Sequence, residues 1–272
     1  MQHHTLPFKS THIHFTDQGK GQTVIFLHGF LEDARMWQGV KRYLPGNYRV
    51  ICIDLFGHGQ SDGIGFIYRM EEMAEAVEAV IKTLRLRKVH LVGHSMGGYV
   101  ALALAEHNPD IIRTLSLVHS TARADSIRKK QDRDRAVAMV KRDCAGFIKH
   151  AIPLLFSLEA RKKPVKAIDR LTKNALQIKA GSVAASLEGM KIRPDREAIL
   201  HFAPYPILLL AGINDTVVST QDLEEQMQAD GVTGVWLPTA HMGPWEMPKA
   251  TAEVLHAFWA NNREVLHNMS VR

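Results

Sequence analysis

The stretch KVHLVGHSMGGYVALALAE, residues 88–106, joins two apolar runs through a serine that is bounded by glycines. The first run, residues 88–93, is short and rich in β-branched side chains, which is typical of a buried strand. The second run, residues 96–107, is apolar almost throughout and stops at an Asn-Pro pair, which predicts a helix. Ser95 stands between them in the pattern Gly-x-Ser-x-Gly. A sharp strand-to-helix turn there would project its hydroxyl group into open space.

Runs of the same kind recur along the chain and indicate the fold class. Short apolar segments predict further buried strands, at residues 23–28, 49–54, 114–119, 206–212 and 234–238. Amphipathic periodicity predicts helices at residues 68–86 and 248–261. Strands that are apolar on both faces and alternate with helices belong to parallel sheets. The expected fold is therefore α/β, a mostly parallel open sheet flanked by helices, led by an antiparallel strand at residues 10–17.

One segment, residues 121–196, interrupts this alternation. It contains no convincing strand, and it carries 19 Lys and Arg against 8 Asp and Glu, whereas the whole chain has 34 against 28. A charge-rich helix is predicted at residues 128–142, followed by shorter helical pieces. We interpret the segment as a helical cap inserted into one core domain, which residues 1–120 and 197–272 form.

Composition excludes several classes of protein. Hydrophobic residues make up 46% and charged residues 23% of 272 residues, which is close to the soluble globular average and unlike a disordered or fibrous chain. The two cysteines, Cys52 and Cys144, are far apart and predict neither a disulfide framework nor a zinc cluster. No apolar run is long enough to span a membrane, and residues 1–10 do not resemble a secretory signal. A cytoplasmic location is expected.

Ser95 needs an adjacent base to act as a nucleophile. In the order that this turn predicts, the acid comes next and the histidine last. Asp215 follows the strand predicted at 206–212, and His241 follows the strand predicted at 234–238. The carboxyl ends of parallel strands share one edge of a sheet, so these side chains are expected to meet. Asp125 is the rival acid, although we expect it to be solvated, and His94 is expected to be a packing or hydrogen-bonding neighbour.

Acyl chemistry at a serine also needs two donors for the developing oxyanion. The N–H of Met96, at the positive end of the predicted helix, is one candidate. The other is expected in the loop after an early strand, where Leu27-His28-Gly29-Phe30 makes the N–H of Phe30 the candidate.

The chain resembles the α/β-hydrolase superfamily, specifically its small esterase-like members with a helical cap. The matching motifs span nearly the full chain in family order and are LHGFLEDARMW (27–37), DLFGHGQSD (54–62), GHSMGGYVALALAE (93–106), AGINDTVV (211–218) and AHMGPWEMP (240–248). One departure is Ala240, where the family usually has glycine before the histidine. The resemblance implies acyl transfer to water through an acyl-enzyme, with Ser95, Asp215 and His241 as the triad and with neither a metal nor an organic cofactor.

The resemblance leaves other reactions open on the same three residues. These are C–C bond hydrolysis, thioester hydrolysis, and a lyase reaction like the one that makes a menaquinone precursor. A haloalkane dehalogenase would need an aspartate in place of Ser95. A non-catalytic ligand receptor on the same fold is disfavoured because the three residues are intact.

The expected partner is a small-molecule acyl substrate. The residues predicted to bind it are Trp37, Phe147, Leu155, Phe156 and Trp245, with ordinary cap core as the alternative for each. The basic segment would attract an anionic substrate. The alternative, which we prefer at this point, is that its cations solvate an exposed helix. Neither nucleic acid nor membrane is an expected partner, and the sequence leaves the oligomeric state open.

Overall fold

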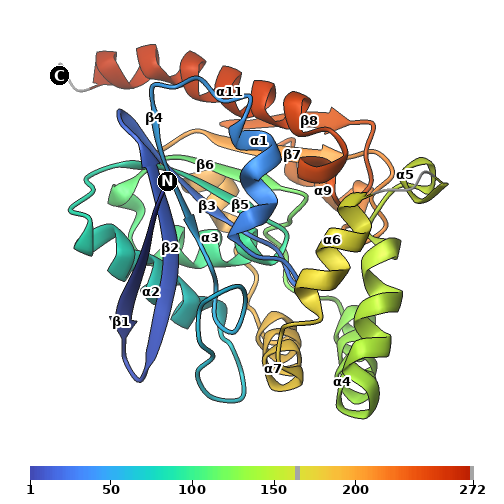
Figure 1. Cartoon of the computed structure of the whole chain (residues 1–272). Helices are drawn as coiled ribbons and strands as arrows, with labels where there is room; N and C mark the ends of the chain where they lie inside the picture. Colours follow the sequence, from blue (N-terminus) through green and yellow to red (C-terminus); the bar gives the residue numbers. More distant parts are fainter. Residues whose placement is uncertain (163–165, 270–272) are drawn as a thin grey trace.

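In the computed structural model, which describes residues 1–162 and 166–269, an eight-stranded sheet forms the centre of the protein (Figure 1). The strand order is β1-β2-β4-β3-β5-β6-β7-β8, with β1 and β2 antiparallel to their neighbours and the other pairs parallel. The predicted mostly parallel open sheet is therefore confirmed. The bounds are β1 Gln2–Phe8, β2 Thr11–Gly19, β3 Gln22–Leu27, β4 Tyr48–Ile53, β5 Val89–His94, β6 Ile112–Val118, β7 Ile207–Gly212 and β8 Val232–Leu237.

Helices cover both faces of the sheet because its central strands are apolar on both faces. Along β3, Val24 and Phe26 enter one core cluster, whereas Ile25 and Leu27 enter another. The first cluster includes side chains of α1 (Gln38–Lys41) and α11 (Pro248–Met269), and the second those of α2 (Met70–Thr83) and α3 (Met96–His107). The remaining short helices outside residues 121–202 are η1 Ala34–Trp37, η2 Pro109–Ile111, α9 Thr220–Gln226 and α10 Gly243–Glu246.

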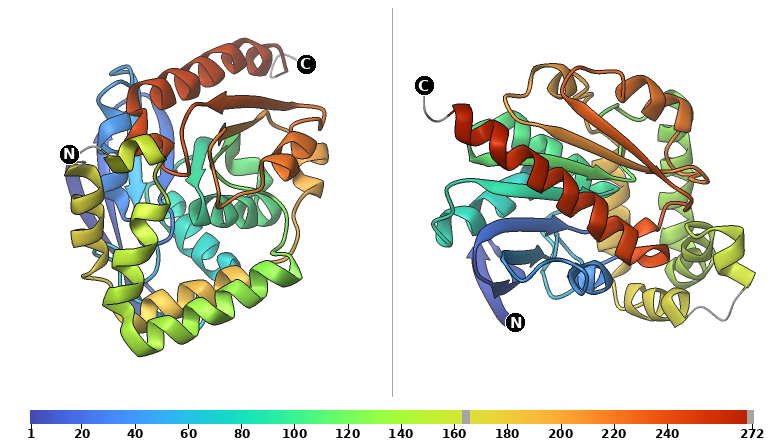
Figure 2. Two further views of the ribbon diagram at one scale, coloured as in Figure 1. Left: turned by 90° about the vertical axis from the view of Figure 1, so that its right-hand side faces the viewer. Right: turned by 90° about the horizontal axis from the view of Figure 1, so that it is seen from above.

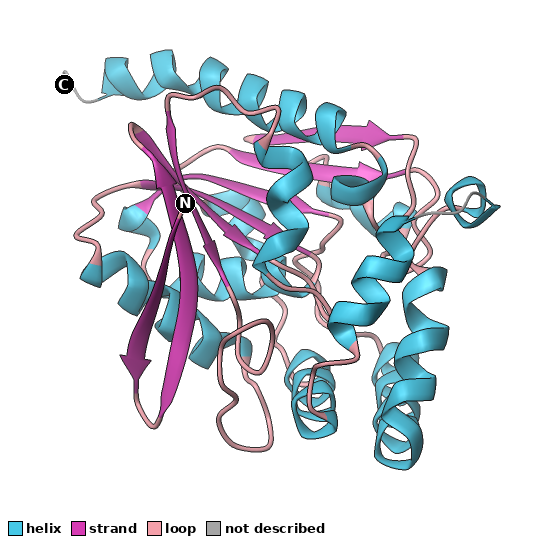
Figure 3. Ribbon diagram, viewed as in Figure 1, coloured by secondary structure: helices cyan, strands magenta, loops and turns pink. Residues whose placement is uncertain are grey.

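Between β6 and β7 the described chain is helical, as predicted. Helices α4 to α7 lie on the side toward which the parallel strands point (Figures 1 and 3), and the left view of Figure 2 shows them from that side. The predicted helix at 128–142 is the first part of a longer one, which bends at Asp143 (φ −154°, ψ 85°), where the Asp143 carboxylate accepts the N–H of Gly146. Their bounds are α4 Ile127–Leu154, α5 Leu158–Lys162, α6 Lys166–Ala175, α7 Ala180–Lys191 and α8 Ala198–Phe202. None of the described helices combines the length and apolarity needed to cross a bilayer.

One strand was missed from the sequence. Strand β1 pairs with β2 as an edge hairpin, and its side chains alternate between exposed and partly buried. Its polar sequence QHHTLPF lacks the buried apolar face that marks the other strands, so periodicity gave no signal.

Candidate active site

Ser95 lies in a strained turn as the single residue between β5 and α3. Its backbone has φ 49° and ψ −115°, a region that costs a non-glycine residue on the order of 1–3 kcal/mol. The turn closes because its two flanking glycines lack side chains. A Cβ on Gly93 would lie 2.3 Å from the carbonyl oxygen of Gly97, and a Cβ on Gly97 would lie 2.6 Å from that of His28. The predicted strand–turn–helix unit is therefore present, with the serine at its apex.

A hydrogen-bonded chain of three side chains begins at this serine. His241 Nε2 lies 2.8 Å from Ser95 Oγ, and His241 Nδ1 lies 2.8 Å from Asp215 Oδ2. Because a carboxylate only accepts, Nδ1 carries the proton and Nε2 is left to accept the serine hydroxyl hydrogen. Burial alone would raise the pKa of Asp215, but the charge and hydrogen bonds of the adjacent imidazoles hold that pKa far below its usual value. The structure thus brings together the three residues selected from the sequence.

Loops at neighbouring strand ends place the acid and the base. Asp215 follows β7, and its second oxygen, Oδ1, accepts the N–H groups of Val217 and Val218 at 2.8 and 3.1 Å. His241 follows β8, and its own N–H donates to the carbonyl of Leu155 in the helical segment at 3.1 Å. Because β7 and β8 pair in parallel, the two loops leave the sheet at one edge.

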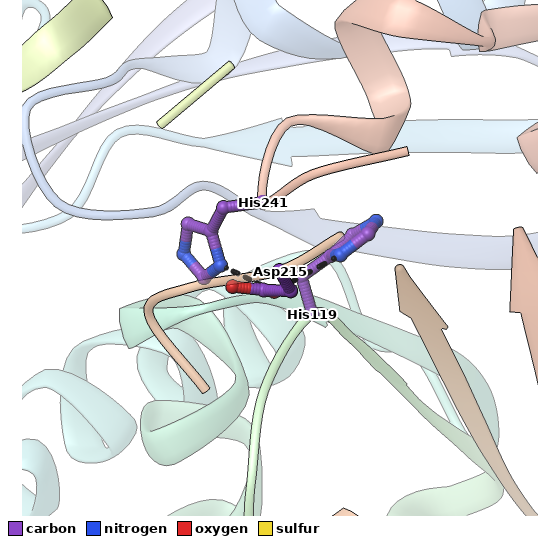
Figure 4. A group of neighbouring side chains, drawn as sticks. All are labelled: His119, Asp215 and His241. Carbon is purple, nitrogen blue, oxygen red and sulfur yellow. Dashed lines mark hydrogen bonds and ion pairs between the residues drawn. The ribbon is translucent and has the colours of Figure 1, made fainter. Parts of the chain in front are cut away.

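A second histidine contacts the same carboxylate, and Asp215 lies between the two imidazole rings (Figure 4). His119 follows β6, has φ 48°, and its Nδ1 lies 3.3 Å from Asp215 Oδ2. The sequence did not distinguish His119 from the other histidines. Its place at the carboxyl end of a predicted strand was the available signal.

The ligand atoms of His119, Asp215 and His241 lie within 4.8 Å of one another, which is close enough to consider a metal. Both Nδ1 groups face the carboxylate at hydrogen-bond distance, so both donate their protons to it. A metal would need the lone pairs of these nitrogens instead. Hydrogen bonding explains the cluster, and we assign no metal to it.

A buried ion pair between Glu32 and His94 connects the loops around the serine. His94 Nδ1 lies 2.7 Å from Glu32 Oε2, and its Nε2 lies 2.9 Å from the carbonyl oxygen of His241. Both partners only accept, so both ring nitrogens carry protons and the ring is cationic. Burial alone would lower the pKa of His94, but the Glu32 carboxylate raises it above its ordinary value. In the same way, burial alone would raise the pKa of Glu32, but His94 holds it below its ordinary value. Glu32 also accepts the N–H of Gly29 at 2.9 Å and the indole N–H of Trp245 at 3.2 Å.

The two predicted oxyanion donors lie on neighbouring elements. Leu27 pairs in register with Gly93, so the turn that contains Phe30 leaves β3 beside the turn that carries Ser95. Phe30 lines the pocket at Ser95. Met96 begins α3, and the N–H groups of a helix's first turn have no carbonyl partner within the helix.

A pocket of about 120 Å³ opens over Ser95. Its apolar lining comes from the turn after β3, the helical segment and the loops after β7 and β8, with one aromatic side chain from α3. These lining residues are Phe30, Leu155, Met190, Val217 and Met242, with Tyr99 beside them. Of the five predicted substrate-binding residues, Leu155 alone is among the residues that border this pocket.

The other four predicted substrate-binding residues lie elsewhere, so these predictions were wrong for this pocket. Trp37 is fully buried and packs against Phe26, with ring centroids 4.5 Å apart, in the core on the α11 face. Phe156 is buried in the core cluster that also holds side chains of α2, α3 and the helical segment, and Phe147 packs against that cluster. Trp245 directs its indole N–H to Glu32. Each is apolar, and apolarity alone does not separate a core position from a pocket wall.

Asp125 is not solvated, contrary to the prediction. It is 7% exposed, and its Oδ1 accepts from Arg193 Nη1 at 2.6 Å while its Oδ2 accepts from Arg133 Nε. Burial alone would raise its pKa, but the two guanidinium groups lower it. Asp125 therefore balances basic side chains of the helical segment, and its contacts are not with His241.

The basic face of α4 is not uniformly solvated either. Lys129 and Arg133 border the Ser95 pocket, so the preferred interpretation of an exposed, solvated face is wrong for these two. The interpretation of a solvated face is correct for four other cations of the helix, which are exposed. These are Lys130, Arg135, Lys141 and Arg142. The helical periodicity of the charges could not show which of them turn inward.

Two buried histidines are expected to make folding sensitive to acid. Burial lowers the pKa of His58 and of His119 to about 4 in each case, from an unfolded value near 6.5. Between these values the unfolded chain binds more protons than the folded one, so stability falls as the pH falls. The expected loss is about 2 kcal/mol for each histidine between pH 6.5 and 5.

Urea unfolding at pH 7 and pH 5 measures this loss. The decrease in unfolding free energy should be smaller by about 2 kcal/mol in His58→Gln than in the wild type. His201→Gln is the matched control, because His201 is exposed and its imidazole is solvated in both the folded and the unfolded chain. An equal decrease in the wild type and His58→Gln would contradict the expectation.

Comparison with known proteins gives a consistent picture. Residues 22–230 match the model of a family described as the alpha/beta hydrolase fold. A thermophilic esterase from Thermogutta terrifontis, solved with malate bound, is 30% identical and superposes with a TM-score of 0.89, covering 96% of this chain and 99% of that one. An enol-lactonase from Burkholderia xenovorans, 21% identical over 94% of this chain and 99% of its own, shares the fold with a TM-score of 0.86.

Curated relatives match over shorter stretches. An (E)-2-((N-methylformamido)methylene)succinate hydrolase from Acinetobacter baylyi is 27% identical over 126 residues, which are 46% of this chain and 48% of that protein. An uncharacterized protein of Mycobacterium tuberculosis is 34% identical over 117 residues, 42% of this chain and 34% of its own length. The match thus spans about a third to a half of these relatives.

Proposed function

The chain belongs to the alpha/beta hydrolase fold family, and from this premise we propose that it is a serine hydrolase that cleaves a carboxylic ester of a small or medium acyl group. The observation that carries the proposal is the 2.8 Å separation between Ser95 Oγ and His241 Nε2, with Asp215 at 2.8 Å behind the histidine. The similar esterase structure from Thermogutta terrifontis supports a hydrolase. That the bond cleaved is a carboxylic ester is our proposal.

The proposed mechanism uses each of these groups in turn. His241 takes the proton of Ser95 as the serine oxygen attacks the ester carbonyl, and Asp215 stabilises the imidazolium that forms. The N–H groups of Phe30 and Met96 bind the oxyanion. The imidazolium then protonates the leaving alcohol, and water, activated by the same histidine, hydrolyses the acyl-enzyme.

The volume of the pocket limits the length of the acyl chain that we expect the substrate to carry. A cavity of about 150 Å³ holds one benzene molecule, so the 120 Å³ over Ser95 suits a short acyl chain. We propose that residues 121–196 act as a cap over it, because Leu155, Met190 and Lys129 of this segment border the pocket.

A panel of p-nitrophenyl esters from acetyl to lauroyl tests this function. The second-order rate constant kcat/KM should be highest between acetyl and hexanoyl and should fall for lauroyl, which exceeds the pocket. Absence of turnover for every ester would contradict the esterase proposal. If a fluorophosphonate still labelled Ser95, C–C bond hydrolysis or a lyase reaction on the same residues would be favoured.

A further inference from the structure

Helix α4 presents two basic side chains to the Ser95 pocket. Lys129 and Arg133 lie one turn apart on the helix, and both border the pocket together with Ser95 and His241. Lys129 also borders a wider hollow of about 680 Å³, which Asp215 lines as well. The residue Lys129 therefore borders both the reaction pocket and this hollow.

The two neighbouring guanidinium groups share one carboxylate partner, whereas Lys129 has none among the residues that the structure describes. Arg133 and Arg193 both form ion pairs with Asp125. The Lys129 ammonium donates to the carbonyl oxygen of Val217 at 2.8 Å. No carboxylate in the described parts of the chain forms an ion pair with it. Three cations around one carboxylate leave an excess of positive charge beside the nucleophile.

The remaining carboxylates at this site cancel that excess only in part. Glu32 borders the same pocket but is held by the cationic ring of His94 and by two N–H donors. Asp215 accepts from His241, from His119 and from two backbone N–H groups, and its negative charge offsets one of the two excess positive charges. Burial also lowers the pKa of Lys129, as expected for an ammonium group that lacks full solvation.

We propose that the substrate bears a carboxylate besides its scissile ester, and that Lys129 binds this carboxylate inside the pocket. The inference rests on the proposed function, because it names the class of ester that Ser95 attacks. Among the described residues at the pocket, Lys129 is the cation without a carboxylate partner, so it can pair with one carboxylate of the substrate. Arg133 stays paired with Asp125 and attracts the substrate carboxylate at longer range. An ion pair with a half-buried ammonium group is stronger than one with an exposed ammonium group, because less water competes for the charges.

A structural role for Lys129 is the competing explanation, because its hydrogen bond to Val217 ties α4 to the loop that carries Asp215. Loss of that tie would slow hydrolysis of every ester equally. Loss of a carboxylate-binding group would slow the charged esters selectively. The ratio of rate constants for charged and neutral esters therefore separates the two roles.

The test uses pairs of esters that differ by a carboxylate in place of a methyl group. These are monomethyl succinate with methyl butyrate, and monomethyl glutarate with methyl pentanoate. The wild type should prefer the charged member of at least one pair in kcat/KM. Lys129→Gln should lower this preference by about 10- to 100-fold, and Lys129→Arg, which keeps the charge, should retain most of it. Lys130→Gln, which removes an exposed charge from the next position, should leave the preference unchanged within about twofold.

The inference would be overturned if the wild type showed no preference for the charged esters, or if Lys129→Gln left that preference unchanged. Either result would leave the proposal of esterase activity intact. A binding readout covers the case in which no ester is hydrolysed. Calorimetric titration of Ser95→Ala protein with glutarate should then show binding that Lys129→Gln weakens at least tenfold and Lys130→Gln does not. Equal affinity in all three proteins, or no binding to any, would overturn the inference independently of the reaction.

Discussion

Replacing Ser95 by alanine is expected to abolish turnover of p-nitrophenyl butyrate, a loss on the order of 10⁶-fold in kcat by comparison with a serine protease that lacks its nucleophile. The reason is that the serine oxygen is the atom proposed to form the acyl-enzyme, and no other hydroxyl group lies within hydrogen-bond distance of His241 Nε2 in the described residues. The hydroxyl contributes little to packing, so the circular dichroism spectrum and thermal midpoint should stay close to those of the wild type.

Ser10→Ala is the matched control for this variant. Ser10 is exposed in the turn between β1 and β2, so the same substitution there should leave kcat and KM unchanged. Turnover by folded Ser95→Ala at a tenth of the wild-type rate or more would show that another group performs the chemistry.

Asp215→Asn is expected to lower kcat by on the order of 10⁴-fold with little change in KM. The carboxylate holds the proton of His241 on Nδ1, at 2.8 Å, and stabilises the imidazolium during attack. An asparagine amide can donate to Nδ1 instead, which places the ring proton on Nε2 and leaves no lone pair facing Ser95. Steady-state kinetics on the same ester measures the effect.

Asp230→Asn controls for the loss of one carboxylate, because Asp230 is exposed in the loop before β8. Its kinetics should match the wild type. If Asp215→Asn kept its activity within about tenfold, the orientation of His241 would depend on another group, and His119, the other imidazole on this carboxylate, would be the first to examine.

The fold could be predicted from the sequence wherever apolar periodicity was strong. The central strands are buried on both faces, so their apolar runs predicted their positions to within two residues. Strand β1 is an edge strand with exposed side chains and left no such pattern. The continuation of α4 beyond residue 142 was missed because Asp143 breaks the helical backbone and caps a second part of the helix, which a charge-rich sequence does not reveal.

The site was predictable where residues follow strand ends in a fixed order, as Ser95, Asp215 and His241 do. The ion pair between Glu32 and His94 joins residues 62 positions apart, and no local pattern connects them. The prediction of the residues that line the pocket was wrong for a different reason. Trp37 and Phe156 are as apolar as Leu155, and only the packing of the folded chain decides which of these side chains faces the serine.

Labelling with a fluorophosphonate, followed by mass spectrometry of the digested protein, tests the central claim that His241 activates Ser95 for attack on an acyl carbonyl. The expected result is one adduct per chain on the peptide that contains Ser95, formed much more slowly in Asp215→Asn and absent in Ser95→Ala. An adduct on a different residue, or an unlabelled Ser95 in protein that hydrolyses esters, would contradict the account.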